Sequence, residues 1–171
     1  MSEPARQIAI RHGEQLPSYS SQEEAKAAWF SFRNNHLSIL HKAATKQSAF
    51  IPYYQAESLK QVELWYFQLY GSDSFHSLDL TREVFEICMA MYFGENAVHS
   101  ANARWVVKKY FLGSGKCELG VCKGSMTMML WRFTDYYPEP NNKRQQSLFR
   151  LYKKYFSRYV FINTNLNNLV R

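Results

Sequence analysis

The sequence predicts an α+β fold, with N-terminal helices and a buried central helix packed on a three-stranded antiparallel meander and closed by a C-terminal amphipathic helix. Apolar residues recur with helical spacing through most of residues 20–101, and the pattern changes to that of strands after Asn102. A strongly two-sided helical pattern returns after Asn142. Since the chain has 171 residues, of which 46% are hydrophobic, we expect a single domain over residues 1–171.

The first 19 residues are expected to form a mobile lead-in or a loosely docked arm. They contain two prolines and a glycine and show no apolar period. A first helix is predicted to begin at Ser20 or Ser21, because either hydroxyl can cap it and two glutamates follow in the first turn. It is expected to extend to about Lys46.

Two further helices precede the change of pattern. One is predicted over about residues 56–69, with Gly71 suited to a left-handed C-terminal cap. The other is predicted to begin near Asp79 as its N-cap. Because apolar residues occur nearly all the way round this helix, it is expected to be the buried central one.

Three strands are predicted after Asn102, over residues 104–111, 117–123 and 126–133, although the methionines of the last segment are also compatible with a helix. Glycine-containing turns at 112–116 and 124–125 connect them into a meander. A final helix is predicted over residues 143–159, with leucines and aromatic residues on one side and lysines and arginines on the other. The tail, residues 163–171, is expected to be a short edge strand or to be frayed.

The charge is unevenly distributed along the chain. Residues 1–102 carry 8 Lys and Arg against 11 Asp and Glu, whereas residues 103–171 carry 13 against 3. A positive field of this kind attracts an acidic protein or a nucleic acid, and the same lysines and arginines are also typical of a solvated helix face. The predicted partner-binding basic surface consists of Lys108, Lys109, Arg132, Lys143, Arg150, Lys154 and Arg158.

No catalytic constellation, cofactor motif or metal site is expected. The run from Gly113 to Lys116 lacks the additional glycine and the following hydroxyl of a nucleoside-triphosphate loop. The weak acid/base candidates are Glu95 and His99, which share a helical face four residues apart. An ordinary helix-terminal contact is the other interpretation of this pair.

The expected location is the cytoplasm. The N-terminus has no basic segment followed by an apolar run, and no stretch approaches the roughly 20 apolar residues that cross a bilayer. Three cysteines, an odd number, form no disulfide framework. We expect no membrane partner.

The run from Met91 to Glu95 at the end of the buried helix, followed by Trp105 at the start of a hairpin, resembles a pattern in small bacterial α+β proteins. Several of these resemble immunity partners of polymorphic toxins. The resemblance covers about residues 80–138. In it, Gly94 lets the backbone turn closely after the helix, Glu95 pairs locally and Trp105 anchors the hairpin in the core.

The resemblance implies a non-enzymatic cytoplasmic protein that binds a toxin domain and blocks its active site or its substrate path. The basic charge is compatible with this function, because a positive field speeds the encounter with an acidic partner. The alternative is a nucleic-acid-binding accessory protein that uses the basic C-terminal half, including Lys143, Arg150, Lys154 and Arg158.

Overall fold

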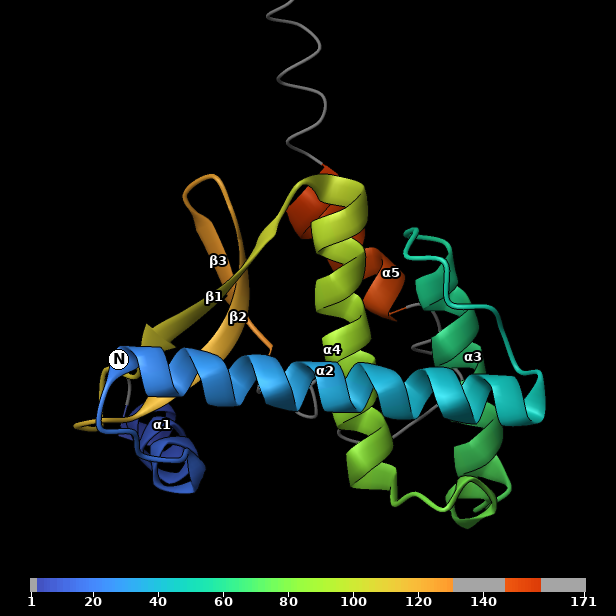
Figure 1. The fold of residues 1–171 in the computed structure, drawn as a ribbon, viewed down its shortest axis with the longest axis horizontal. Helices are drawn as coiled ribbons and strands as arrows, with labels where there is room; N and C mark the ends of the chain where they lie inside the picture. Colours follow the sequence, from blue (N-terminus) through green and yellow to red (C-terminus); the bar gives the residue numbers. More distant parts are fainter. Residues whose placement is uncertain (1–2, 131–146, 158–171) are drawn as a thin grey trace, which may run out of the picture.

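A computed structural model gives the fold and describes residues 3–130 and 147–157. The α+β class predicted from the sequence is confirmed (Figure 1). The described elements are α1 (Glu3–Gln15), α2 (Gln22–Gln47), α3 (Ser58–Gly71), η1 (Phe75–Leu78), α4 (Arg82–Ala101), β1 (Arg104–Lys109), β2 (Cys117–Lys123), β3 (Met126–Met129), α5 (Ser147–Tyr152) and η4 (Lys153–Ser157).

Helix α4 is the centre of the molecule, as predicted. It contacts α2, α3, α5 and the sheet, and α2 crosses it in Figure 1. Phe85, Met91, Phe93 and Gly94 on α4 are all buried. Because these residues lie on different sides of the helix, α4 loses contact with water over most of its circumference and organises the core.

The three strands form an antiparallel meander in the order β1-β2-β3, which confirms the predicted topology. Leu119 and Val121 of β2 face the core and are fully buried. The first strand ends at Lys109, two residues before its predicted end. The third ends at Met129, and its predicted continuation over residues 131–133 lies outside the described residues.

In the N-terminal segment, expected to be a mobile lead-in or a loosely docked arm, residues 3–15 form helix α1, which was not predicted. The Tyr110 hydroxyl donates a 2.7 Å hydrogen bond to the Ala9 carbonyl, and His12 Nε2 lies 3.4 Å from Glu118 Oε2 on β2. A side chain at Gly13 would meet the Tyr110 ring at 2.7 Å. The face that packs on the sheet is therefore built from small and polar residues, which carry no apolar period.

The predicted helix starts and stops are partly confirmed. Ser21 caps α2, and its hydroxyl accepts a hydrogen bond from the Glu24 amide. Asp79 is not the N-cap of α4: it takes a left-handed conformation, with φ 58°, after η1, and the Thr81 hydroxyl caps α4 instead. Asp79 can occupy this left-handed position after η1 because aspartate tolerates a positive φ better than most residues.

The prediction for Gly71 was wrong in a similar way. Gly71 is the last residue of α3 and has no positive φ, and the left-handed residue is Asp73. The chain reverses two residues later than predicted, where the Ser74 amide donates to the Leu69 carbonyl and leads into η1.

The described part of the final helix comprises α5 and the π-helical turn η4; residues 143–146 and 158–159 of the predicted helix lie outside it. Leu148, Tyr152 and Phe156 are buried, in agreement with the predicted apolar side. Glu63 of α3, which is 1% exposed, accepts hydrogen bonds from the Ser147 and Leu148 amides at 2.7 and 2.9 Å. A buried carboxylate of one helix thus binds two backbone amides of another.

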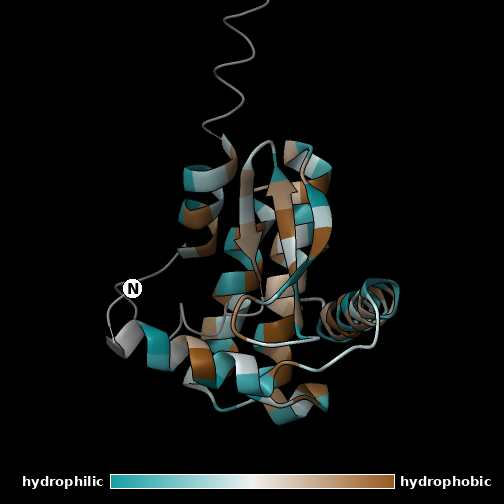
Figure 2. Cartoon of the chain, turned by 90° about the vertical axis from the view of Figure 1, so that its left-hand side faces the viewer, coloured by the Kyte–Doolittle hydropathy of each residue, from teal (hydrophilic) through white to brown (hydrophobic). Residues whose placement is uncertain are grey.

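Hydrophobic and hydrophilic residues are interleaved along the helices in Figure 2. Over residues 3–130 and 147–157, no helix has both the length and the apolar character to cross a membrane.

Candidate functional site

Gly94 lies in the middle of α4, directly against the Trp105 indole at the start of β1. A Cβ atom at position 94 would lie 2.2 Å from Trp105 Cη2 and 2.5 Å from Leu130 Cδ1. The glycine is required for this close approach, and not for a turn after the helix as the resemblance implied. We call Gly94, Glu95 and Trp105 together the α4–β1 junction.

Glu95 connects the junction to the predicted acid/base pair. Its Oε2 accepts a 2.8 Å hydrogen bond from Trp105 Nε1–H, and its Oε1 lies 3.2 Å from His99 Nε2. The carboxylate side chain is 18% exposed and the imidazole 52% exposed. The predicted pair of Glu95 and His99 therefore forms. The Glu95 carboxylate also binds Trp105, a structural partner ten residues away that the sequence did not predict.

Tyr54, in the loop between α2 and α3, extends this cluster. Its ring stacks on His99 with centroids 4.7 Å apart and planes inclined by 12°. Its hydroxyl lies 2.8 Å from His41 Nε2 on α2. Tyr54 has φ 47°, a left-handed conformation that is strained for a bulky residue. The two contacts hold the loop in this conformation.

Burial sets the ionisation of this tyrosine and its histidine partner. It raises the pKa of Tyr54 to about 12, with further contributions from the Glu95 and Tyr92 charges. Burial lowers the pKa of His41, and the Glu95 carboxylate opposes that decrease. The Tyr54–His41 contact therefore joins two neutral groups at pH 7.

The chemistry that this cluster can carry is limited by its partners. No serine, threonine or cysteine of the described chain is hydrogen-bonded to Glu95 or His99, so a nucleophile–base pair is not assembled there. Within the same residues, no three His, Cys, Asp or Glu side chains are placed to hold a metal ion. The contacts of Glu95 and Tyr54 connect α2, α4 and β1, which is a structural role.

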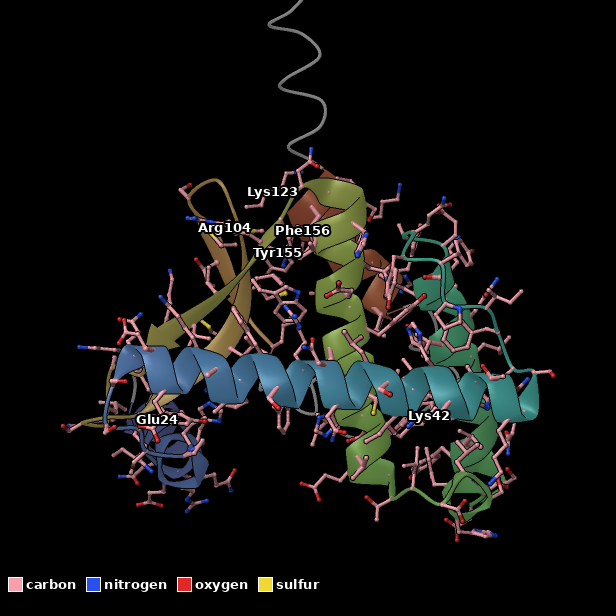
Figure 3. All side chains as sticks on the ribbon, in the orientation of Figure 1. Glu24, Lys42, Arg104, Lys123, Tyr155 and Phe156 are labelled. Carbon is pink, nitrogen blue, oxygen red and sulfur yellow. The ribbon has the colours of Figure 1, made fainter. Side chains whose placement is uncertain are left out.

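The described members of the predicted basic surface fall into two groups. Lys108 and Lys109 are exposed near the end of β1, where Lys109 pairs with the first residue of β2. At the other end of β2, Lys123 Nζ donates to the Phe156 carbonyl of η4, and Figure 3 shows these two labelled residues together. Six residue steps along a strand span roughly 20 Å. The exposed Arg150 and Lys154 of α5 and η4 thus belong to the opposite end from Lys108 and Lys109.

The remaining basic candidates, Arg132, Lys143 and Arg158, lie outside the described residues. Among nearby lysines, Lys116 donates to the Leu16 carbonyl and so holds the chain before α2. The ammonium of Lys109, by contrast, makes no hydrogen bond or ion pair with another described residue. It is exposed and available for a partner.

The connection between β1 and β2 carries a feature that sequence reasoning missed. Phe111 is 64% exposed and Leu112 is 40% exposed, and we call these two residues the hairpin tip. Beside them lies a groove of about 480 Å³, lined by residues 19–22, 109–110 and 113–117 and called here the hairpin groove. Strand alternation would place Phe111 on the core face with Val107, but β1 ends at Lys109, which is itself exposed, and Phe111 lies beyond it.

Comparison with known proteins now places the chain in a family. A family model described as "Uncharacterised protein YwmA" matches residues 18–156. The chain belongs to this family. The uncharacterized protein YwmA of Bacillus subtilis (strain 168) is 28% identical over 111 residues, which cover 64% of this chain and 70% of the relative. No solved structure matches the chain.

The matched range includes the junction, the hairpin tip and the hairpin groove, whereas helix α1 precedes it. The family description names no activity.

Proposed function

We propose that this chain is a non-catalytic cytoplasmic binding protein of the immunity or antitoxin type, which neutralises a toxin domain by direct contact through its hairpin end. The observation that carries the proposal is the hairpin tip: a phenylalanine and a leucine exposed side by side, next to the exposed Lys108 and Lys109.

An apolar centre with a charged rim is the composition of many protein-binding surfaces. Aromatic residues at the centre of such surfaces contribute much of the binding energy, because the partner removes their apolar area from water. The charges of the two lysines speed the approach of an acidic partner and disfavour a basic one, and the Lys108 ammonium also donates a 2.8 Å hydrogen bond to Thr127 Oγ1 on β3. Phe111 and Leu112 thus supply affinity, and Lys108 and Lys109 supply steering.

The structural partners of Glu95 support a binding function over a hydrolytic one, because its two carboxylate oxygens already contact Trp105 and His99. The nucleic-acid alternative relies on the basic residues of the C-terminal helix. The described members of that set, Arg150 and Lys154, lie at the opposite end of the sheet from the hairpin tip and do not extend its surface.

The test is co-expression with the product of the gene adjacent to the one that encodes this chain, followed by purification and a growth assay. We expect a one-to-one complex and relief of toxicity. The double substitution Phe111→Ser with Leu112→Ser should weaken the complex by roughly 30-fold or more, as expected when anchor residues are removed. Ile51→Ser is the matched control, because Ile51 is 79% exposed but lies in the loop after α2.

A complex that tolerates the double substitution, or the absence of both complex and rescue, would contradict the proposal. Binding of a single-stranded oligonucleotide that falls steeply with salt and is lost on Arg150→Glu with Lys154→Glu would favour the nucleic-acid alternative.

A further inference from the structure

We infer that the hairpin groove binds an extended acidic segment of the partner protein. This inference rests on the proposed function, because it names the part of the partner that the hairpin end would recognise. Shape, charge and the capping of α2 each support it.

The walls of the groove are held in place by the backbone. The Tyr19 amide donates a 2.9 Å hydrogen bond to the Gly115 carbonyl, and Ser18 forms an antiparallel bridge with Lys116. Gly115 has φ 70°, and a Cβ atom there would lie 3.1 Å from the Tyr19 carbonyl oxygen. Because the segment before α2 is attached to the hairpin in this way, the groove exists before a ligand arrives, and binding need not order it.

The groove offers donors and no carboxylate of its own. Its lining contains Lys109 and Lys116, the hydroxyls of Tyr19 and three serines, and neither aspartate nor glutamate. The Lys109 ammonium and the Ser114 hydroxyl have no hydrogen-bonding partner in the described chain. Glu24 on α2 accepts hydrogen bonds from the hydroxyl and the amide of the lining residue Ser20, which lower the pKa of the Glu24 carboxyl. An acidic ligand complements this lining.

A segment of chain fits these features better than a small free anion does. The first turn of α2 is already capped, because the Glu24 amide donates to the Ser21 hydroxyl and the Glu24 carboxylate covers Ser20. A compact anion at that helix start would meet the Glu24 charge. Carboxylates spaced along a peptide reach Lys109 and Ser114, while an apolar neighbour in the same peptide contacts Phe111.

The experiment uses the full chain labelled with ¹⁵N and a defined probe, the peptide acetyl-(Glu-Leu-Glu-Gly)₃-amide, with the same peptide carrying Lys for Glu as a control. We expect amide shifts at residues 19–22 and 109–116 with the acidic peptide alone. Lys109→Glu should weaken its binding about tenfold, because an attraction becomes a repulsion. Lys42→Glu makes the same charge change near the far end of α2 from Glu24 (Figure 3) and should leave binding unchanged.

Shifts at other residues, equal shifts with both peptides, or unaltered binding by the Lys109→Glu protein would overturn the inference. So would the same shifts with inorganic phosphate or a single-stranded oligonucleotide at equal concentration. If the neighbour's complex depends on Phe111 and Leu112 but not on Lys109, the inference fails while the proposed function stands. If the acidic peptide binds to the groove but no complex with the neighbour forms, the proposed function fails while binding of an acidic segment by the groove stands.

Discussion

The two ends of β1 differ in how they use large apolar side chains. At its start, Trp105 packs against Gly94 and donates a hydrogen bond to Glu95. Beyond its end, Phe111 and Leu112 lie in water at the hairpin tip. The α4–β1 junction, which has a distinctive sequence pattern, thus stabilises the fold. The hairpin tip, which is available to a partner, has a sequence typical of an ordinary strand.

Gly94→Ala should give the largest loss of stability at neutral pH. The added methyl group would overlap the Trp105 indole and Leu130, so the sheet must move away from α4. We expect a loss of about 3 kcal/mol in the free energy of unfolding, measured by urea denaturation, because overpacking a core forces its neighbours to shift.

Gly71→Ala is the matched control for this change. Position 71 is also helical, but nothing lies within 4 Å of an added Cβ atom. The control should gain about 0.5 kcal/mol from the better helix propensity of alanine. Equal losses at the two positions would show that the contact with Trp105 is unimportant.

A second test compares the interior of α4 with the hairpin end through the free energy of unfolding at alkaline pH. Burial raises the pKa of Cys88 from 9.0 to about 12. Since the folded chain then holds this proton more tightly than the unfolded chain, the resulting stability is complete below pH 9 and is lost as the pH rises towards 12.

Cys88→Ala should make the fall in unfolding free energy between pH 9 and 12 shallower by about 1.4 kcal/mol per pH unit, the value for one proton. The measurement is urea denaturation at several pH values. The hairpin-tip double substitution serves as the control and should keep the original slope. Equal slopes of unfolding free energy against pH for the Cys88→Ala and unaltered proteins would contradict the expectation that burial raises the pKa of Cys88.

The smallest effect on stability is expected at the hairpin tip. Phe111→Ser with Leu112→Ser should change the free energy of unfolding by less than about 0.5 kcal/mol, because both side chains already contact water. Thermal or urea unfolding measures this. A loss of 2 kcal/mol or more would mean that the tip supports the core, and the contrast between the two ends of β1 would disappear.

The sequence was sufficient for the class of fold and for most elements, because α2, α4 and the strands have apolar periods of their own. It was not sufficient for α1, whose packed face consists of Ala9, His12 and Gly13. These residues show no apolar period, and their contacts are with Tyr110 and Glu118, about 100 residues later in the chain. Helix ends such as Asp79 depended on the path of the next turn, which local propensity does not determine.

For the candidate site, spacing correctly placed Glu95 beside His99, since four residues on a helix lie on one face. The third partner, Trp105, comes from another element, and one sequence alone does not pair them. The basic residues failed as a single surface for the same reason: strand pairing separates Lys109 from the C-terminal helix.

The contact of Glu63 with α5 has a consequence for the order of folding. Short helical segments are marginal by themselves in water. The Ser147 and Leu148 amides obtain their acceptor from α3, 84 and 85 residues earlier in the chain. We therefore expect residues 147–152 to become stably helical once α3 has docked, so that this segment reports on the core beneath it.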